Sequence, residues 1–149
     1  MGSLEQELIR HTAVGVDTSP FIYLWERHPR YLPLSETLFG YLKNPGVQGI
    51  TSVITLIESC VLPRREGRFD LVEAYQRALS RSQQVHLVPV DVALARSALA
   101  LRADYDIRVP DALQIGAALA AGATLFITND RLLQRVKELE VLVLEDYAA

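Results

Sequence analysis

The stretch PDALQIGAALAAGATLFITND, residues 110–130, decides the fold. Its first half is rich in Ala, Leu and Ile, which predicts a deeply packed helix over residues 112–121 that ends at Gly122. Residues 124–128 then form a short apolar run, which predicts a buried strand. A packed helix followed directly by a buried strand is typical of a parallel sheet whose two faces are covered by helices.

The same alternation of short apolar runs and amphipathic segments extends in both directions from this stretch. It predicts an α/β fold of three layers, α/β/α, around a central parallel sheet of five strands. In one predicted helix, over residues 53–62, Val53, Leu56, Ile57, Cys60 and Val61 form a single apolar stripe. The predicted strands are residues 12–16, 47–51, 85–90, 124–128 and 141–144, and the other helices are 19–25, 34–43, 69–82, 92–103 and a short one from 131.

Length and composition are typical of one soluble globular domain. The 149 residues are half hydrophobic, and we expect residues 1–149 to form a single domain with residues 1–11 as an N-terminal extension. Its apolar runs are too short to span a bilayer, and the N-terminus lacks the organisation of a signal peptide. Cys60 is the only cysteine, which excludes an internal disulfide and fits a reducing cytoplasm.

The net charge of −3 argues mildly against a nucleic-acid partner. Net charge hides its distribution, however, because 13 of the 15 basic residues are Arg. Arginine makes the bidentate contacts that phosphates and carboxylates accept. The charge balance alone therefore leaves the class of partner open.

Four acidic residues flank apolar segments instead of charged faces: Asp17, Glu58, Asp111 and Asp130. Asp17 and Asp130 each come directly after a predicted strand or just beyond it. Ligands of parallel sheets bind beyond the carboxyl ends of the strands, at a topological switch point. If the first and fourth strands are neighbours, both carboxylates face one crevice.

Each of these acids also has a structural explanation. Asp17 and Asp130 can be helix N-caps, and Asp111 can interact with the positive end of its helix. Glu58 is harder to explain in this way, because VITLIESCV surrounds it with apolar residues and a partly buried carboxylate needs a partner. One shared cation explains all four more economically, since hard divalent ions take carboxylate ligands.

The order of these segments resembles the PIN domain family, to which many VapC-type toxins belong. The resemblance rests on GVDTSPFIYL, SVITLIES and PDALQIGAALAAGATLFITND, and it extends over residues 12–144. It implies a metal-dependent endoribonuclease whose acidic cluster cleaves RNA phosphodiester bonds, with the first and fourth strands adjacent. The implied site has acids at Asp17, Glu58, Asp111 and Asp130, a polar residue at Thr128, an added hydroxyl from Thr18 or Ser19, and Asn129 within the motif.

The resemblance further implies Mg²⁺ or Mn²⁺, frequent homodimers and, in toxin members, a cognate antitoxin that blocks the site. Two features depart from a typical toxin: the chain is acidic overall, and it has an extension before Thr12. Both weaken the assignment as the toxin of a type II toxin–antitoxin pair more than the assignment as a nuclease.

A divalent cation would make such an acidic site attractive to an anionic substrate. It would polarise a phosphoryl oxygen and lower the pKa of a bound water. We assign Asp17 and Asp130 as direct ligands, Asp111 as a ligand or as the residue that orients the metal-bound water, and Glu58 as a ligand of a second metal or a base that positions water. Whether one metal or two is bound stays open at this point.

The segment LPRREGRF offers Arg64, Arg65 and Arg68 for binding flanking phosphates of RNA. The same three side chains can equally form an ordinary solvated loop or meet an acidic protein partner. The sequence does not decide among these.

Three other functions are weighed against a nuclease. An aspartyl phosphatase would need a second acid two residues after Asp17, where Ser19 stands. A response-receiver domain would need an acidic pair after the first strand and a Lys after the last, and neither is present. A catalytically inactive PIN-like module that binds protein or RNA is disfavoured by the four acids but not excluded.

Overall fold

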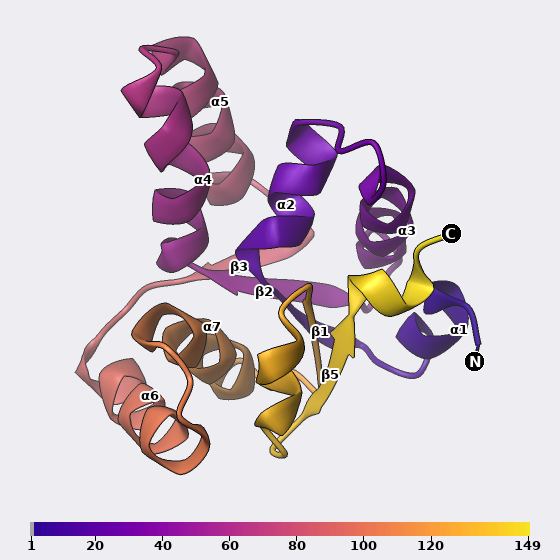
Figure 1. The fold of residues 1–149 in the computed structure, drawn as a ribbon, viewed down its shortest axis with the longest axis vertical. Helices are drawn as coiled ribbons and strands as arrows, with labels where there is room; N and C mark the ends of the chain where they lie inside the picture. The colour runs from indigo at the N-terminus through magenta and orange to yellow at the C-terminus, as the bar shows by residue number, and fades with distance from the viewer. Residues whose placement is uncertain (1) are drawn as a thin grey trace.

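A computed structural model describes residues 2–149 and contains one five-stranded sheet. All four strand pairings are parallel, and the strand order is β3-β2-β1-β4-β5 (Figure 1). The predicted α/β/α fold with a central parallel sheet of five strands is therefore confirmed. The strands are β1 (Ala13–Val16), β2 (Gln48–Ser52), β3 (Val85–Val88), β4 (Leu125–Thr128) and β5 (Glu140–Val143).

The strand order changes direction beside β1, which pairs with β2 on one side and with β4 on the other. Gly15 is aligned with Phe126 in β4, so β1 and β4 end at the same edge of the sheet. The predicted adjacency of the first and fourth strands is confirmed. This edge between β1 and β4 is the topological switch point, where α/β sheets bind their ligands.

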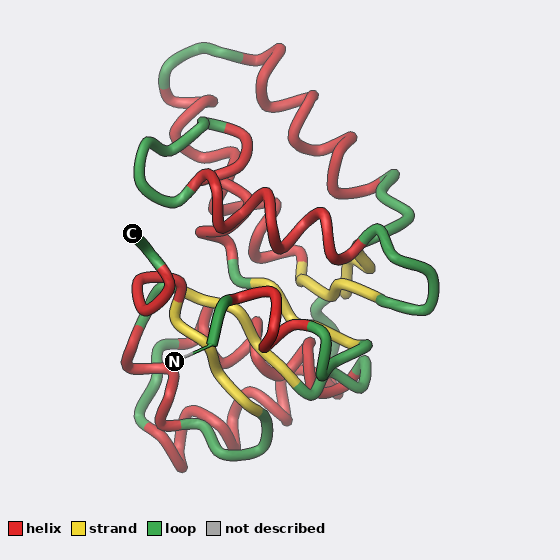
Figure 2. Tube along the Cα trace, turned by 90° about the vertical axis from the view of Figure 1, so that its right-hand side faces the viewer, coloured by secondary structure: helices red, strands yellow, loops and turns green. Residues whose placement is uncertain are grey.

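Helices cover both faces of the sheet, as Figure 2 shows from the side. One face is covered by α6 and α7, which bury their side chains together with Phe126 and Val141. The other face is covered by α1, α2, α3 and α5, which form one buried cluster with residues of β1, β3 and β4. The helices are α1 (Leu4–Leu8), α2 (Thr18–Trp25), α3 (Leu32–Leu42), α4 (Val53–Arg65), α5 (Phe69–Ser80), α6 (Val92–Tyr105) and α7 (Val109–Ala120), with 3-10 helices η1 (Arg131–Arg135) and η2 (Leu144–Tyr147).

Strand β4 is buried on both of its faces, which explains why its sequence is a continuous apolar run. Leu125 and Ile127 pack in the α2–α3 layer, whereas Phe126 packs in the α6–α7 layer. Gly15 in β1 allows α7 to approach closely, because a Cβ atom there would lie 2.6 Å from the Cβ of Ala118. These contacts place α7 directly against β1, next to the switch point.

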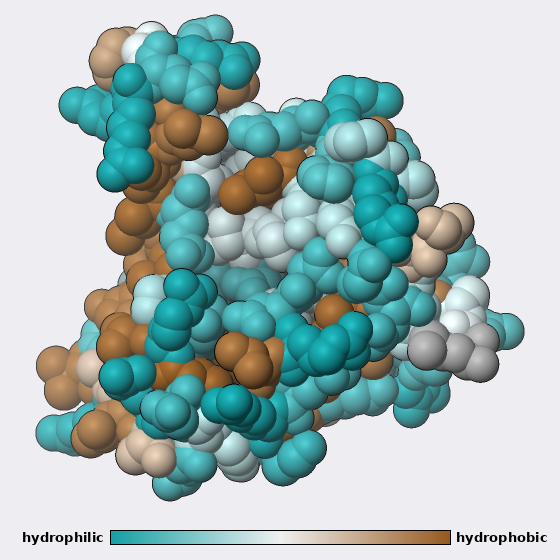
Figure 3. Space-filling view, viewed as in Figure 1, coloured by the Kyte–Doolittle hydropathy of each residue, from teal (hydrophilic) through white to brown (hydrophobic). Residues whose placement is uncertain are grey.

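Helix α4 departs from the prediction, because its apolar stripe is not fully buried. Ile57, Val61 and Leu62 are 54, 38 and 56% exposed. The buried residues of α4 are instead small or polar: Thr55, Ser59, Cys60 and Pro63. The hydrophobic periodicity correctly predicted a helix here, but it identified only part of the buried side of that helix. Apolar side chains consequently line the outer side of α4, along the left edge of Figure 3.

Two further details differ from the sequence-based prediction. The N-terminal extension contains a helix that was not predicted: α1 has a capping box at Ser3 and buries Leu4 and Leu8 against α3. Helix α4 was predicted to end at residue 62, but it contains Pro63 and continues to Arg65. No helix in the described part of the chain is long and apolar enough to cross a membrane.

Candidate active site

A cleft lies at the carboxyl ends of β1 and β4, beside the first turns of α2 and α7 and one side of α4. The structure brings all four predicted acids into this cleft, together with every predicted supporting residue. The lining residues are Asp17, Thr18, Ser19, Ile22, Tyr23, Glu58, Arg108, Asp111, Thr128, Asn129 and Asp130.

Asp17 is the N-cap of α2 and also lines the cleft. Its Oδ1 accepts a hydrogen bond from the backbone N–H of Thr18 at 2.8 Å, and its Oδ2 accepts one from the Thr128 hydroxyl at 2.7 Å. Burial raises the pKa of Asp17 to about 6, and the charges of Asp111 and Glu58 add to the rise. The two hydrogen bonds lower the pKa but do not cancel the effect of burial.

Asp130, just beyond the end of β4, likewise caps a helix and lines the cleft. It caps η1, where its Oδ1 accepts a hydrogen bond from the N–H of Leu132 at 3.0 Å. Thr128 connects it to Asp17, because the Thr128 hydroxyl accepts from the N–H of Asp130 at 3.1 Å while donating to Asp17. The structural and functional explanations of Asp17 and Asp130 therefore do not compete: each caps a helix and faces the cleft.

Asp111 lies in the first turn of α7 and is 8% exposed. Burial raises its pKa, and the charges of Asp130 and Glu58 add to that rise. Arg108 opposes the rise, because its Nε donates a hydrogen bond to Asp111 Oδ2 at 3.2 Å. Arg108 was not predicted from the sequence, where it is one basic residue among many.

Glu58 projects from α4 and is exposed, not partly buried as its apolar neighbours suggested. One carboxylate oxygen, Oε1, is nevertheless fixed, since the Thr18 hydroxyl donates to it at 2.7 Å. Thr18 itself is buried at the start of α2. The predicted hydroxyl contribution therefore comes from Thr18, while Ser19 lines the cleft.

Gln114, a buried residue of α7, supports Thr18 by a hydrogen bond and was not predicted from the sequence. The side chain is 2% exposed, its Nε2 donates to the hydroxyls of Thr55 at 2.8 Å and Thr18 at 3.1 Å, and its Oε1 accepts from the Ser52 hydroxyl at 2.5 Å. Because Thr18 gives its only hydroxyl proton to Glu58, it must accept from Gln114. A buried Gln on an otherwise apolar helix face was the available signal.

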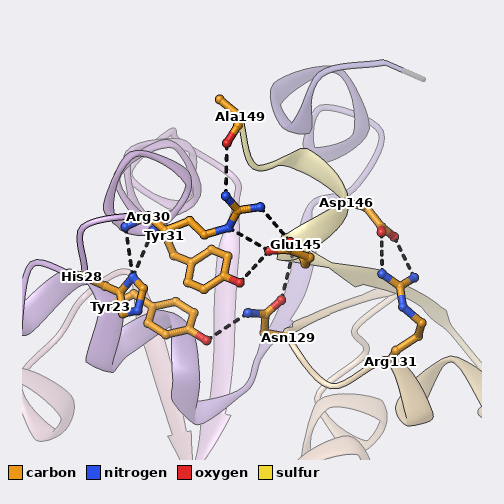
Figure 4. A network of polar contacts seen from close by, with 9 residues as sticks. All are labelled: Tyr23, His28, Arg30, Tyr31, Asn129, Arg131, Glu145, Asp146 and Ala149. Carbon is orange, nitrogen blue, oxygen red and sulfur yellow. Dashed lines mark hydrogen bonds and ion pairs between the residues drawn. The ribbon is translucent and has the colours of Figure 1, made fainter.

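Asn129 connects the C-terminal segment to α2, and within residues 2–149 its side chain makes no hydrogen bond to an acid of the cleft. Its Nδ2 donates to the Tyr23 hydroxyl at 3.0 Å, and its Oδ1 accepts from the N–H of Glu145 at 2.9 Å. Figure 4 shows this connection beside the ion pair of Arg30 with Glu145. Its observed contacts are thus those of a structural residue at the rim.

Arg64, Arg65 and Arg68 do not line the cleft. They lie where α4 ends and α5 begins, at the top of Figure 1 and away from the carboxyl ends of the strands. Arg64 stacks over the ring of Phe69, with 5.4 Å between its guanidinium carbon and the ring centroid. Their role in binding RNA stays a prediction.

The donor set of the cleft suits a hard divalent cation, because it consists of carboxylate and hydroxyl oxygens. Burial is the main cause of the raised pKa values of Asp17 and Asp111, and such an ion would relieve the repulsion by neighbouring carboxylates that adds to them. Within residues 2–149, however, no three acidic, His or Cys side chains are already close enough to hold a metal. Binding would require the carboxylates that line the cleft to come closer together.

Comparisons with known proteins agree with this fold. The family model described as "PIN domain" matches residues 14–139. A toxin–antitoxin complex from Klebsiella pneumoniae has a chain with a TM-score of 0.65 and 21% identity, covering 89% of this chain and 97% of that one. A chain of VapBC2 from Rickettsia felis, bound to a DNA fragment from its promoter, has a TM-score of 0.65 and 17% identity, with coverage of 87 and 97%.

No curated protein matches the chain. The family match nevertheless extends from β1 almost to the start of β5 and includes all four acids of the cleft. The chain therefore belongs to the PIN domain family.

Proposed function

We propose that this protein is a divalent-metal-dependent endoribonuclease. The observation that carries the proposal is the convergence of Asp17, Glu58, Asp111 and Asp130 on one cleft at the switch point of a PIN domain. Burial raises the pKa values of Asp17 and Asp111, and carboxyl groups perturbed in this way are concentrated at functional sites. The PIN family makes nucleic-acid hydrolysis the chemistry that such a cluster serves.

We assign Asp17, Asp130 and Asp111 to hold Mg²⁺ or Mn²⁺, with Glu58 serving a second ion or a water. Such an ion, when bound, polarises the phosphoryl oxygen and lowers the pKa of a bound water. The protein contributes orientation: Thr128 fixes one oxygen of Asp17 and Thr18 fixes one oxygen of Glu58. Gln114 holds Thr18 in place from the buried side.

The test is cleavage of a mixed panel of single-stranded and structured RNAs by the purified protein in Mg²⁺, in Mn²⁺ and in excess chelator. We expect cleavage of single-stranded RNA with either ion and none with chelator. Equal cleavage with and without chelator would reject the metal mechanism. Binding of RNA without cleavage in any condition would support the alternative, an inactive PIN-like binding module.

We also propose that the protein acts as the toxin of a type II toxin–antitoxin pair in the cytoplasm, with an antitoxin as partner. Both structural neighbours described above come from toxin–antitoxin complexes. The outer side of α4, with Ile57, Val61 and Leu62 exposed, is an apolar surface of the kind that protein partners cover. A homodimer would cover such a surface equally well and stays a second prediction.

A further inference from the structure

Arg108 is the basic side chain of an otherwise acidic cleft. Among the described residues that line it, four are carboxylates and only Arg108 is basic, so the lining carries a formal charge of −3. An RNA phosphate that approaches this lining is repelled by the acids. Arg108 is therefore the one point of the lining that attracts an anion without a metal.

The guanidinium of Arg108 is anchored along one edge only. Its Nε donates to Asp111 Oδ2 at 3.2 Å, and no hydrogen bond from either Nη group to the rest of residues 2–149 is present. The two partners differ in exposure: the side chain of Asp111 is 11% exposed and that of Arg108 is 75% exposed. The buried partner thus holds the near edge of the guanidinium while the far end faces solvent.

This leaves a pair of donors whose geometry suits a phosphate. A guanidinium carries five N–H donors in a rigid plane, and with Nε engaged the two Nη groups remain as a fork. Two parallel N–H···O bonds to neighbouring phosphate oxygens are the preferred contact of such a fork. The backbone supports the position, because Arg108 is the N-cap residue of α7 and Pro110 lies in the first turn.

We propose that Arg108 positions the substrate: Asp111 anchors its Nε, and its two Nη groups bind non-bridging oxygens of an RNA phosphate beside the acidic cluster. The inference rests on the proposed nuclease function and adds a residue to it. The proposal places one phosphate contact inside the cleft, at Arg108. Any contacts made by Arg64, Arg65 and Arg68 would lie outside the cleft.

The rival explanation is that Arg108 only neutralises Asp111. Removing Arg108 would then lower the melting temperature, because the buried Asp111 carboxylate loses its partner, but it would not change how RNA binds. The two explanations therefore differ in RNA affinity and in its salt dependence.

The experiment compares wild type with Arg108→Gln, Arg108→Lys and the control Arg96→Gln, which removes one exposed charge from α6 outside the cleft. Binding of a fluorescent single-stranded RNA is measured by anisotropy in chelator over a range of salt concentrations. Steady-state kcat and KM are measured with Mn²⁺. Melting in chelator reports on folding of each variant.

Arg108→Gln should weaken RNA binding and raise KM by about 10- to 100-fold, the loss expected for charge-assisted hydrogen bonds. Its salt slope should fall by about 0.7, the value for one lost contact to a single strand. Arg108→Lys should restore the slope but only part of the affinity, because it lacks the planar fork. Arg96→Gln should behave as wild type.

Unchanged affinity and slope in a folded Arg108→Gln protein would overturn this inference and leave Arg108 as a counter-ion, even if wild type cleaves RNA. A wild type that binds no RNA in chelator would overturn it too. Failure of wild type to cleave, with the slope change still present, would count against the nuclease function alone.

Discussion

Asp17 combines a structural and a functional position in one side chain. It caps α2 through one oxygen and meets Thr128 through the other, while sharing the cleft with three further carboxylates. A cap alone does not need burial, and burial is what raises its pKa. A cation bound in the cleft would lower this raised pKa.

This gives a prediction for the metal-free protein. Because the pKa of Asp17 is about 6 in the folded state and near 4 in the unfolded chain, its stabilising effect is complete below pH 4 and is lost as the pH rises through 6. The loss is at most about 3 kcal/mol. We expect urea unfolding in chelator to show that the free energy of unfolding of Asp17→Asn rises relative to that of wild type between pH 4.5 and pH 7. A stability difference that is the same at both pH values would contradict the raised pKa.

The residues that sequence reasoning identified are those with a positional signal. Asp17 and Asp130 follow apolar strands, and Glu58 interrupts an apolar segment. Arg108 has no such signal, because it is one basic residue among many and its pairing with Asp111, three residues away, becomes important only where both face the cleft. Gln114 offers only a polar residue within an apolar helix, and its importance lies in bonds to hydroxyls on α2 and α4. Hydrogen-bond partners far apart in sequence cannot be deduced from periodicity.

At the scale of elements, α4 is the helix that the sequence described least well. Its apolar residues are distributed around more than one side, so periodicity could not distinguish the buried side from the exposed one. The buried side is set instead by hydrogen bonds, including those that Thr55 makes with Thr51 and Gln114. The hydrogen bonds of Thr55 therefore help to determine which side of α4 faces the core.

The turn between α4 and α5 allows a second prediction at this scale. Arg64, Arg65 and Arg68 lie outside the cleft, so their replacement by Ala should leave kcat unchanged. If they contact flanking phosphates, RNA affinity should fall and the salt slope should flatten by about 0.7 for each lost contact. Anisotropy titrations at several salt concentrations measure this, with Arg77→Ala on α5 as the control. A triple variant with the wild-type slope would assign the turn to plain surface or to a protein partner.

For the whole molecule, the parallel five-stranded sheet was accessible from the sequence because short apolar strands alternate regularly with helices. The adjacency of the first and fourth strands was implied by the resemblance to the PIN domain family, and the rest of the strand order is known only from the structure. What remained hidden was the N-terminal helix α1, which is only five residues long. Short helices depend on tertiary packing, here of Leu4 and Leu8, more than on propensity.

The central claim is that the acids at the switch point hold a catalytic metal, and Asp130→Asn tests it most directly. Asn caps a helix about as well as Asp, so the variant should keep the cap of η1 and the fold. The decisive measurement is the rate of single-stranded RNA cleavage in Mn²⁺ by wild type and by Asp130→Asn, with melting in chelator as the check on folding. We predict that the folded variant loses at least about 100-fold in rate, in line with the loss of a group that stabilises transition-state charge. A folded Asp130→Asn protein that cleaves RNA at the wild-type rate would contradict the assignment of this cleft as the metal-dependent active site.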